Sequence, residues 1–150
     1  NEGEFVIKYR WGTSEKSDGI LVNKDNLREH IGINFKDCIV QERLDIKDRY
    51  RLVFLGEEFL GGLRFRNYGN HIEEYTPSST IIEESRQILN HADVTMGSVD
   101  WIKLRNSNYD RFPLEINGVS TNFGSEKHAY NISKKIAVGL QREYLSPVLS

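Results

Sequence analysis

The sequence predicts an α+β fold, in which strands are grouped into hairpins and helices lie between the groups. Six or seven short runs rich in β-forming residues alternate irregularly with two or three helical segments. This order differs from the regular strand–helix–strand alternation of a continuous parallel sheet. The length of 150 residues fits either one compact domain or two small lobes that share a cleft.

The N-terminal elements surround a polar loop that contains glycine. We expect strands at 4–9, 19–22 and 38–44, a loop at 11–18, and a short helix at about 25–31. This helix should end at Gly32, because glycine adopts a left-handed helix cap at little cost.

The middle of the chain predicts a hairpin and an amphipathic helix. Strands at 50–55 and 58–65 flank Gly56-Glu57, which suits a two-residue turn with positive φ at its first position. Thr80 and Glu83 have the spacing of a capping box, and apolar residues follow at helical intervals up to Ala92. Strands at 99–104 and 112–117 come next, and a C-terminal helix should begin near Ser125.

The hairpin predicts a basic face. If Leu55 pairs with Glu58 in a regular register, side chains alternate so that cations lie on one face and apolar groups on the other. The basic face would carry Lys47, Arg49, Arg51, Arg64 and Arg66, and the apolar face Leu52, Phe54, Phe59, Leu63 and Phe65. Gly62 would leave a gap where a ligand could approach. Such a face either binds an anion or is a solvated outer surface, since like charges opposite each other are destabilising.

An acidic set predicts a metal site. Glu115 and Asn117 point to the same face of one strand, and Asp100 lies in a neighbouring strand. Magnesium prefers oxygen ligands and typically takes one or two carboxylates plus substrate phosphates. The alternative is a polar edge strand, but apolar and turn residues around Glu115 favour the metal site.

Lys8 and the loop after it form a weaker candidate site. A lysine near a strand end, followed by a glycine-containing loop, can place an ammonium and backbone N–H groups around phosphates. Glycine-containing hairpin loops are common, and this one lacks the GxxxxGK[ST] pattern of a Walker A loop. The four histidines are scattered without the spacing of metal ligands.

Composition limits the classes of partner. The net charge of −2 gives no reason to expect nucleic acid or an anionic membrane, and no apolar run approaches a membrane span. Cys38 is the single cysteine, so no internal disulfide can form and a thiolate zinc cluster is excluded. This cysteine usage fits a cytoplasmic protein.

Four segments resemble ATP-grasp enzymes and run in the same order along the chain. They are CIVQERL at 38–44, RYRLVFLGEEFLGGLRFR at 49–66, VDWI at 99–102 and PLEING at 113–118. The similarity is closest to the ribosomal protein S6 glutamate ligase-like branch and covers nearly the whole chain. It implies the ATP-grasp fold, with ATP held between a small lobe at 1–45 and a large lobe at 46–150.

The resemblance also implies roles for individual residues. Lys8 would contact a phosphate or the adenine edge, and the loop with Gly12, Ser14 and Gly19 would close over the phosphates. The adenine strand would comprise Gln41, Glu42 and Leu44, with Asp45 near the ribose. Arg51 and Arg66 would be catalytic, facing the transferred phosphoryl group, with Arg64 beside them as a cofactor-binding residue. Asp100, Glu115 and Asn117 would hold Mg²⁺ or Mn²⁺.

The implied activity is an ATP-dependent carboxylate–amine ligase acting on small-molecule or peptide substrates. Phosphoryl transfer depends mainly on positioning and charge neutralisation, which arginines and a metal supply. Compared with the family, the N-terminal domain and an upstream lysine are missing, and 67–80 departs from the glutamate ligases. These departures leave the acceptor substrate open and predict a fragment that needs the missing N-terminal domain as a partner. A homo-oligomer is compatible with the sequence.

Two other functions fit parts of the sequence. Lys16-Ser17-Asp18-Gly19 spells KxDG, the lysine–AMP motif of covalent nucleotidyltransferases, although the other motifs of that class are not convincing here. A non-catalytic ATP-binding or regulatory module is the other alternative.

Overall fold

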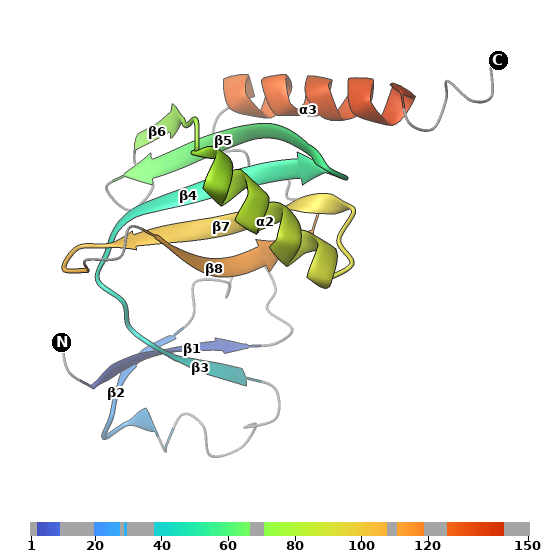
Figure 1. Ribbon diagram of the computed structural model, residues 1–150. Coiled ribbons are helices and arrows are strands. Elements are labelled where there is room, and N and C mark those ends of the chain that lie inside the picture. Colours follow the sequence, from blue (N-terminus) through green and yellow to red (C-terminus); the bar gives the residue numbers. More distant parts are fainter. Residues whose placement is uncertain are drawn as a thin grey trace. The chain divides into compact units, whose positions relative to one another are not determined.

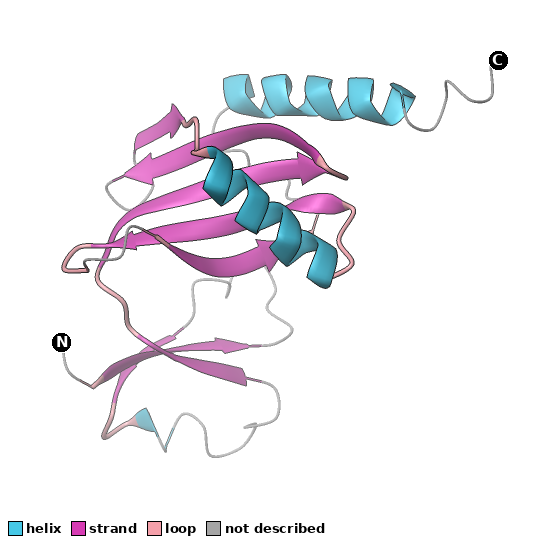
Figure 2. Ribbon diagram, viewed as in Figure 1, coloured by secondary structure: helices cyan, strands magenta, loops and turns pink. Residues whose placement is uncertain are grey.

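The computed structural model describes two compact units, Asn1–Asp45 and Ile46–Ser150. The described residues are 3–9, 20–27, 29, 38–66, 71–107, 111–118 and 126–142. Each unit contains its own antiparallel sheet (Figures 1 and 2). This α+β architecture agrees with the fold class expected from the sequence.

The first unit contains a three-stranded sheet in the order β2-β1-β3. Its strands are β1 (Glu4–Tyr9), β2 (Ile20–Asn23) and β3 (Cys38–Glu42), which confirms the three strands expected here. Ile7 and Val22 are its buried apolar side chains, at 1% and 5% exposure. The expected loop at 11–18 lies outside the described residues, as do Arg28, His30 and Ile31 of the helix expected at 25–31 and its predicted end at Gly32.

The second unit contains a five-stranded sheet in the order β6-β5-β4-β7-β8. Its strands are β4 (Ile46–Leu55), β5 (Glu58–Arg66), β6 (His71–Glu74), β7 (Met96–Leu104) and β8 (Phe112–Asn117). Two helices accompany them, α2 (Ser79–His91) and α3 (Glu126–Leu140). β6 was not expected, because its His-Ile-Glu-Glu sequence carries no apolar alternation.

Helices pack against both faces of this sheet. Figure 1 shows α2 across one face, where Ile81 and Leu89 meet a cluster that includes Phe54 and Trp101. On the other face, Ile132 of α3 packs with apolar residues of β4 and β5. β4 therefore has buried residues on both faces, and its sequence does not show the clean alternation of a half-exposed strand.

The β4–β5 hairpin contains a β-bulge that corrects the expected register. Leu55 pairs with Glu58 and Gly56 has a φ of 52°, as the turn prediction required. The register then shifts between Val53 and Phe54, so Arg51 pairs with Leu63 instead of Gly62. A shift of one residue moves side chains to the opposite face. The expectation of one shared basic face is therefore wrong: Lys47 and Arg49 precede the shift on β4, and Arg64 and Arg66 follow it on β5.

Gly62 allows a close approach of backbone on the side where a side chain would lie. A Cβ atom at this position would lie 2.5 Å from the carbonyl oxygen of Tyr75. The Tyr75 N–H donates to the Gly62 carbonyl at 2.9 Å. The gap expected from the sequence is thus filled by the chain that leaves β6.

Helix α2 begins at Ser79, two residues earlier than predicted from a capping box that starts at Thr80. Ser78 is the N-cap, and its side chain accepts a hydrogen bond from the Ile81 N–H, so the expected capping box is wrong. Further along, Ser85 is fully buried and accepts a hydrogen bond from the Trp101 indole at 2.9 Å. This bond ties the helix to β7.

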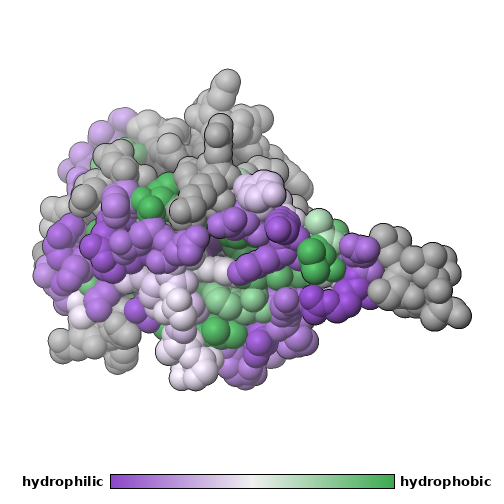
Figure 3. Space-filling model, turned by 90° about the horizontal axis from the view of Figure 1, so that it is seen from above, coloured by the Kyte–Doolittle hydropathy of each residue, from purple (hydrophilic) through white to green (hydrophobic). Residues whose placement is uncertain are grey.

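Helix α3 confirms the expected C-terminal helix, which begins at Glu126. Its side chains Ala129, Ile132 and Ile136 pack on the sheet, whereas Leu140 is 36% exposed. Seen from above, most of the coloured surface is hydrophilic, with smaller hydrophobic patches between (Figure 3). Within the described ranges, no helix has the length and apolar character needed to cross a membrane.

Candidate functional site

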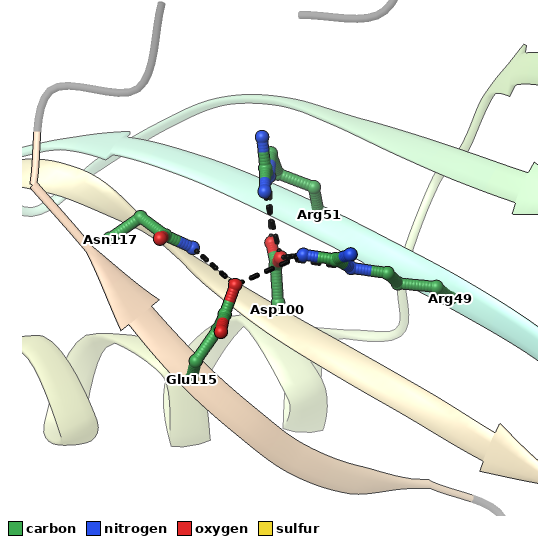
Figure 4. A network of polar contacts seen from close by, with 5 residues as sticks. All are labelled: Arg49, Arg51, Asp100, Glu115 and Asn117. Carbon is green, nitrogen blue, oxygen red and sulfur yellow. Dashed lines mark hydrogen bonds and ion pairs between the residues drawn. The ribbon is translucent and has the colours of Figure 1, made fainter. Parts of the chain in front are cut away.

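A cluster of charged side chains lies where β4, β7 and β8 run side by side. Arg49 and Arg51 come from β4, Asp100 from β7, and Glu115 and Asn117 from β8 (Figure 4). The strand register brings them together, because Asp100 pairs with Arg51 on one side and with Glu115 on the other. Cross-strand partners point to the same face of a sheet, so one surface carries all five groups.

Arg51 and Asp100 form the buried centre of this cluster. The Arg51 Nε atom donates to Asp100 Oδ1 at 2.7 Å, and Nη2 donates to Oδ2 at 2.8 Å. This is a bidentate ion pair, in which two N–H groups of the guanidinium bond to both oxygens of the carboxylate. The Asp100 side chain is 0% exposed and the Arg51 side chain 10%, so the pair is a fixed part of the sheet.

Arg49 joins the two carboxylates from a more exposed position. Its Nε atom donates to Asp100 Oδ2 at 3.0 Å, and its Nη2 atom contacts the same oxygen. Nη2 also donates to Glu115 Oε1 at 3.0 Å. The Arg49 side chain is 40% exposed, so its guanidinium is the solvent-facing cation of the cluster.

Glu115 and Asn117 lie beside each other on β8. The Asn117 amide donates to Glu115 Oε1 at 3.3 Å, across the two-residue repeat that places both side chains on one face. The Glu115 side chain is 34% exposed. Next to the buried Asp100, this pair therefore provides a solvent-accessible carboxylate and an amide.

The two arginines keep Asp100 ionised. Burial by itself would raise the pKa of Asp100, but the hydrogen bond from Arg51 and the charges of Arg49 and Arg51 outweigh it and lower this pKa. The hydrogen bond to Asp100 raises the pKa of Arg51 despite its burial. The site therefore presents a carboxylate and a guanidinium as stable charges over the neutral pH range.

The donor set fits a magnesium ion that also binds phosphates and water. Asp100, Glu115 and Asn117 offer two carboxylates and an amide oxygen, the hard ligands that magnesium prefers. Across the described ranges, no group of three or more His, Cys, Asp or Glu side chains is placed to hold a metal ion. Phosphate oxygens or water would therefore have to supply the remaining ligands.

Two of the expected phosphate-site arginines lie on the opposite face of the sheet. Arg64 donates to Asp48 at 2.8 Å and to Glu73 at 3.3 Å. Arg66 forms an ion pair with Glu73 at 2.9 Å. The bulge in the hairpin causes this separation, so the structure does not bring Arg64 and Arg66 together with Arg51.

The expected nucleotide residues of the first unit are partly described. Lys8 and Gln41 share one face of the small sheet, because Val6 pairs with Gln41 and lies two residues before Lys8. Glu42, opposite Phe5, lies on the other face. Leu44 is 40% exposed, and Asp45 is also exposed.

The remaining candidates lie outside the described residues: Gly12, Ser14, Gly19 and the Lys16 of the KxDG motif. From the sequence, Arg49 was expected on the basic face of the hairpin, with no role at the acidic set. The sequence feature that could have indicated such a role is the two-residue spacing of Arg49 and Arg51, which puts both side chains on one face of β4.

No protein-family model matches this sequence, and no curated protein matches it. Similarity to solved structures shows that the chain has the fold of ATP-grasp ligases. The chain spans about half the length of the proteins that it matches: 49% of the MdnC chain and 45–46% of the PsnB chain.

Three of these structures illustrate the likeness. The macrocyclase MdnC from Microcystis aeruginosa MRC, bound with precursor peptide MdnA, has a TM-score of 0.65 and 16% identity, and 91% of this chain is covered. A RiPP-associated ATP-grasp ligase from Chryseobacterium gregarium, in complex with ADP and a leader and core peptide, has a TM-score of 0.62, 14% identity and coverage of 91% of this chain and 49% of its own. PsnB, complexed with precursor peptide PsnA2 and AMPPNP, has a TM-score of 0.64, 17% identity and coverage of 90% of this chain and 45% of its own.

Proposed function

We propose that this chain is the nucleotide-binding part of an ATP-dependent carboxylate–amine ligase. The observation that carries the proposal is the Arg51–Asp100–Glu115 cluster, a buried guanidinium–carboxylate pair beside a solvent-accessible acid. It occurs on a chain that has the ATP-grasp fold. Fold alone does not define an activity, so the proposal depends on the chemistry of this site.

The proposed substrates are a peptide carboxylate and an amine. Structures of the same fold are complexed with precursor peptides, and that supports a peptide over a small molecule. The carboxylate oxygen attacks the γ-phosphorus of ATP, and ADP leaves with the electron pair of the broken P–O bond. The amine nitrogen then attacks the acyl carbon, phosphate leaves with the electron pair of the broken acyl C–O bond, and the nitrogen releases a proton to solvent to give the amide.

The residues of the second unit would neutralise and position charge. Asp100, Glu115 and Asn117 would hold magnesium, which when bound neutralises phosphate charge. Arg51 has a planar guanidinium that suits phosphate as well as carboxylate, and Asp100 fixes its orientation. No proton transfer by these side chains is needed for the carboxylate to attack.

The residues of the first unit would bind the nucleotide. Gln41, Glu42 and Leu44 would line adenine mostly through backbone groups, Asp45 would lie near the ribose, and Lys8 would bind phosphate or the adenine edge. Gly12, Ser14 and Gly19 would contribute the phosphate loop. We retain Arg51 as the arginine at the transferred phosphoryl group and leave Arg64 and Arg66 out of this role, because both pair with acids on the far face.

Calorimetric titration with a non-hydrolysable ATP analogue, with and without Mg²⁺, tests the proposal. We expect binding that strengthens in the presence of Mg²⁺. Glu115→Ala should remove the Mg²⁺ dependence, because a ligand of the cation is lost. Glu83→Ala is the matched control, since this exposed glutamate lies on α2 at the opposite face. Binding that is equal with and without Mg²⁺ would contradict the metal site.

A non-catalytic nucleotide-binding module is the second candidate. The contact of Arg49 with both carboxylates favours it, because a guanidinium already neutralises the acids there. The two candidates differ in turnover. Formation of ADP by the full-length protein with a peptide carboxylate and an amine, lost in Glu115→Ala, would identify the ligase, and nucleotide binding without turnover would identify the module.

A further inference from the structure

We propose that the Arg49 guanidinium is an internal counter-ion that occupies the place of a divalent cation at Asp100 and Glu115, and that it must leave these carboxylates before a metal ion binds. The inference rests on the proposed metal role of the two acids. It adds a residue that governs the affinity of the site for its cation.

The geometry places the guanidinium and a cation at the same atoms. Arg49 contacts Asp100 Oδ2 through two nitrogens, and one of these also reaches Glu115 Oε1 at 3.0 Å. A cation shared by the two acids would need oxygens of the same carboxylates. Arg51 holds both Asp100 oxygens, Oδ1 at 2.7 Å and Oδ2 at 2.8 Å, and so limits a metal to the positions at Oδ2 and Glu115 Oε1 that Arg49 would vacate.

The two arginines differ in how readily each can move away from Asp100. The side chain of Arg51 is 10% exposed, so breaking its bonds to Asp100 would leave a buried guanidinium without its counter-ion. The side chain of Arg49 is 40% exposed, so its guanidinium can move into water and be solvated. Arg49 is therefore the displaceable cation, and Arg51 is the fixed one.

The charge balance favours exchange over joint occupancy. Two arginines and two carboxylates sum to zero in the cluster shown in Figure 4. A divalent cation added beside Arg49 would leave the cluster with two positive charges in excess. If Arg49 swings away, the carboxylates face the metal and Arg51 alone. The free energy of metal binding should thus be less favourable by the free energy needed to break the Arg49 contacts.

Binding of Mn²⁺ alone to this chain, followed by the electron paramagnetic resonance signal of free Mn²⁺, tests the proposal. We expect Arg49→Gln to bind Mn²⁺ about three- to ten-fold more tightly than the wild type, because a partly exposed ion pair no longer competes. Arg49→Lys should fall between them, since an ammonium lacks the fork that spans both carboxylates.

Arg86→Gln is the matched control. Arg86 also bonds to glutamate from a partly exposed position, at 30% exposure, but it lies on α2. Its replacement should leave the Mn²⁺ affinity unchanged. Adding Glu115→Gln to Arg49→Gln should abolish the gain and thereby locate the ion. Circular dichroism of each variant establishes that it is folded, and Arg49→Lys provides the test if Arg49→Gln is not.

The outcomes separate this inference from the proposed function. An Mn²⁺ affinity that is equal or weaker in the folded Arg49 variants, including no measurable binding by any chain, would overturn the inference. Mg²⁺-dependent binding of the ATP analogue by the wild type would still support the proposed function in that case. Conversely, tighter Mn²⁺ binding by Arg49→Gln without nucleotide binding would support the inference and contradict the function.

Discussion

Arg51 and Asp100 lie directly opposite each other on β4 and β7, and two hydrogen bonds of 2.7 and 2.8 Å join them. We expect Asp100→Ala to lower the free energy of unfolding by about 3–5 kcal/mol, because it leaves a buried guanidinium without its counter-ion. Chemical denaturation measures this change. Replacing both partners by apolar residues, Arg51→Met with Asp100→Leu, should restore much of the loss.

A surface pair is the reference for this prediction. Arg43 and Glu4 form an ion pair of 2.7 Å at 40% and 34% exposure. Arg43→Gln should cost at most about 1 kcal/mol, because water screens and solvates both charges. Equal losses for Asp100→Ala and Arg43→Gln would mean that the buried pair adds no special stability.

Gly62→Ala should destabilise the second unit, and Gly61→Ala should not. A Cβ atom at Gly62 would lie 2.5 Å from the Tyr75 carbonyl oxygen, whereas at Gly61 its nearest neighbour is Ile132 Cγ1 at 3.8 Å. We expect a loss of about 1–3 kcal/mol for the first change, since backbone must shift to relieve the contact. Thermal unfolding of the two variants compares them within the same strand, and similar melting temperatures would count against the close approach.

The Asp48–Arg64 pair should contribute stability that depends on pH. Burial by itself would raise the pKa of Asp48, but the hydrogen bond and charge of Arg64, with Arg66 and Lys47, lower it below 3.8. A lowered carboxyl pKa gives stability that is present above the unfolded-state value and is lost as the pH falls toward the folded-state value.

Asp48→Asn should therefore reduce the loss of stability between neutral pH and about pH 3, because it removes the titrating group. The melting temperature measured across this pH range tests the expectation. Asp93→Asn, at an exposed carboxylate on the loop after α2, is the matched control. An unchanged pH profile in Asp48→Asn would show that this pair does not control the acid sensitivity.

The Trp101–Ser85 bond predicts a cost for removing a single hydroxyl. The Trp101 Nε1–H donates to Ser85 Oγ at 2.9 Å, and Ser85 Oγ donates to the Ile81 carbonyl at 2.7 Å. Ser85→Ala should lower stability by about 1–3 kcal/mol, because the buried indole N–H loses its acceptor. Denaturant unfolding measures it, and Ser79→Ala on the exposed start of α2 serves as the comparison. A loss no larger than that of Ser79→Ala would argue that the indole N–H finds another acceptor.

Strand positions and the acidic set could be predicted from local sequence. The runs at 4–9 and 112–117 were predicted at the bounds that the structure has. The Glu115–Asn117 spacing, with Asp100 on a neighbouring strand, led to a cluster that the sheet register assembles. Such patterns depend on the two-residue repeat of a strand, which sequence shows directly.

Pairing and faces required the tertiary structure. The strand β4 packs on helices at both faces, so its apolar run from Leu52 to Leu55 gives no sign of which face carries Arg51. The strand β6 has too few apolar residues to be recognised, and its place depends on pairing with β5.

The sequence by itself determined where the strands other than β6 lie, that helices follow β6 and β8, which turn joins β4 to β5, and which acids could share a site. The tertiary structure alone decided that Arg49 and Arg51 meet those acids while Arg64 and Arg66 face the opposite side. The physical reason is the β-bulge beside Val53, since one extra residue in β5 reverses the face of every side chain beyond it.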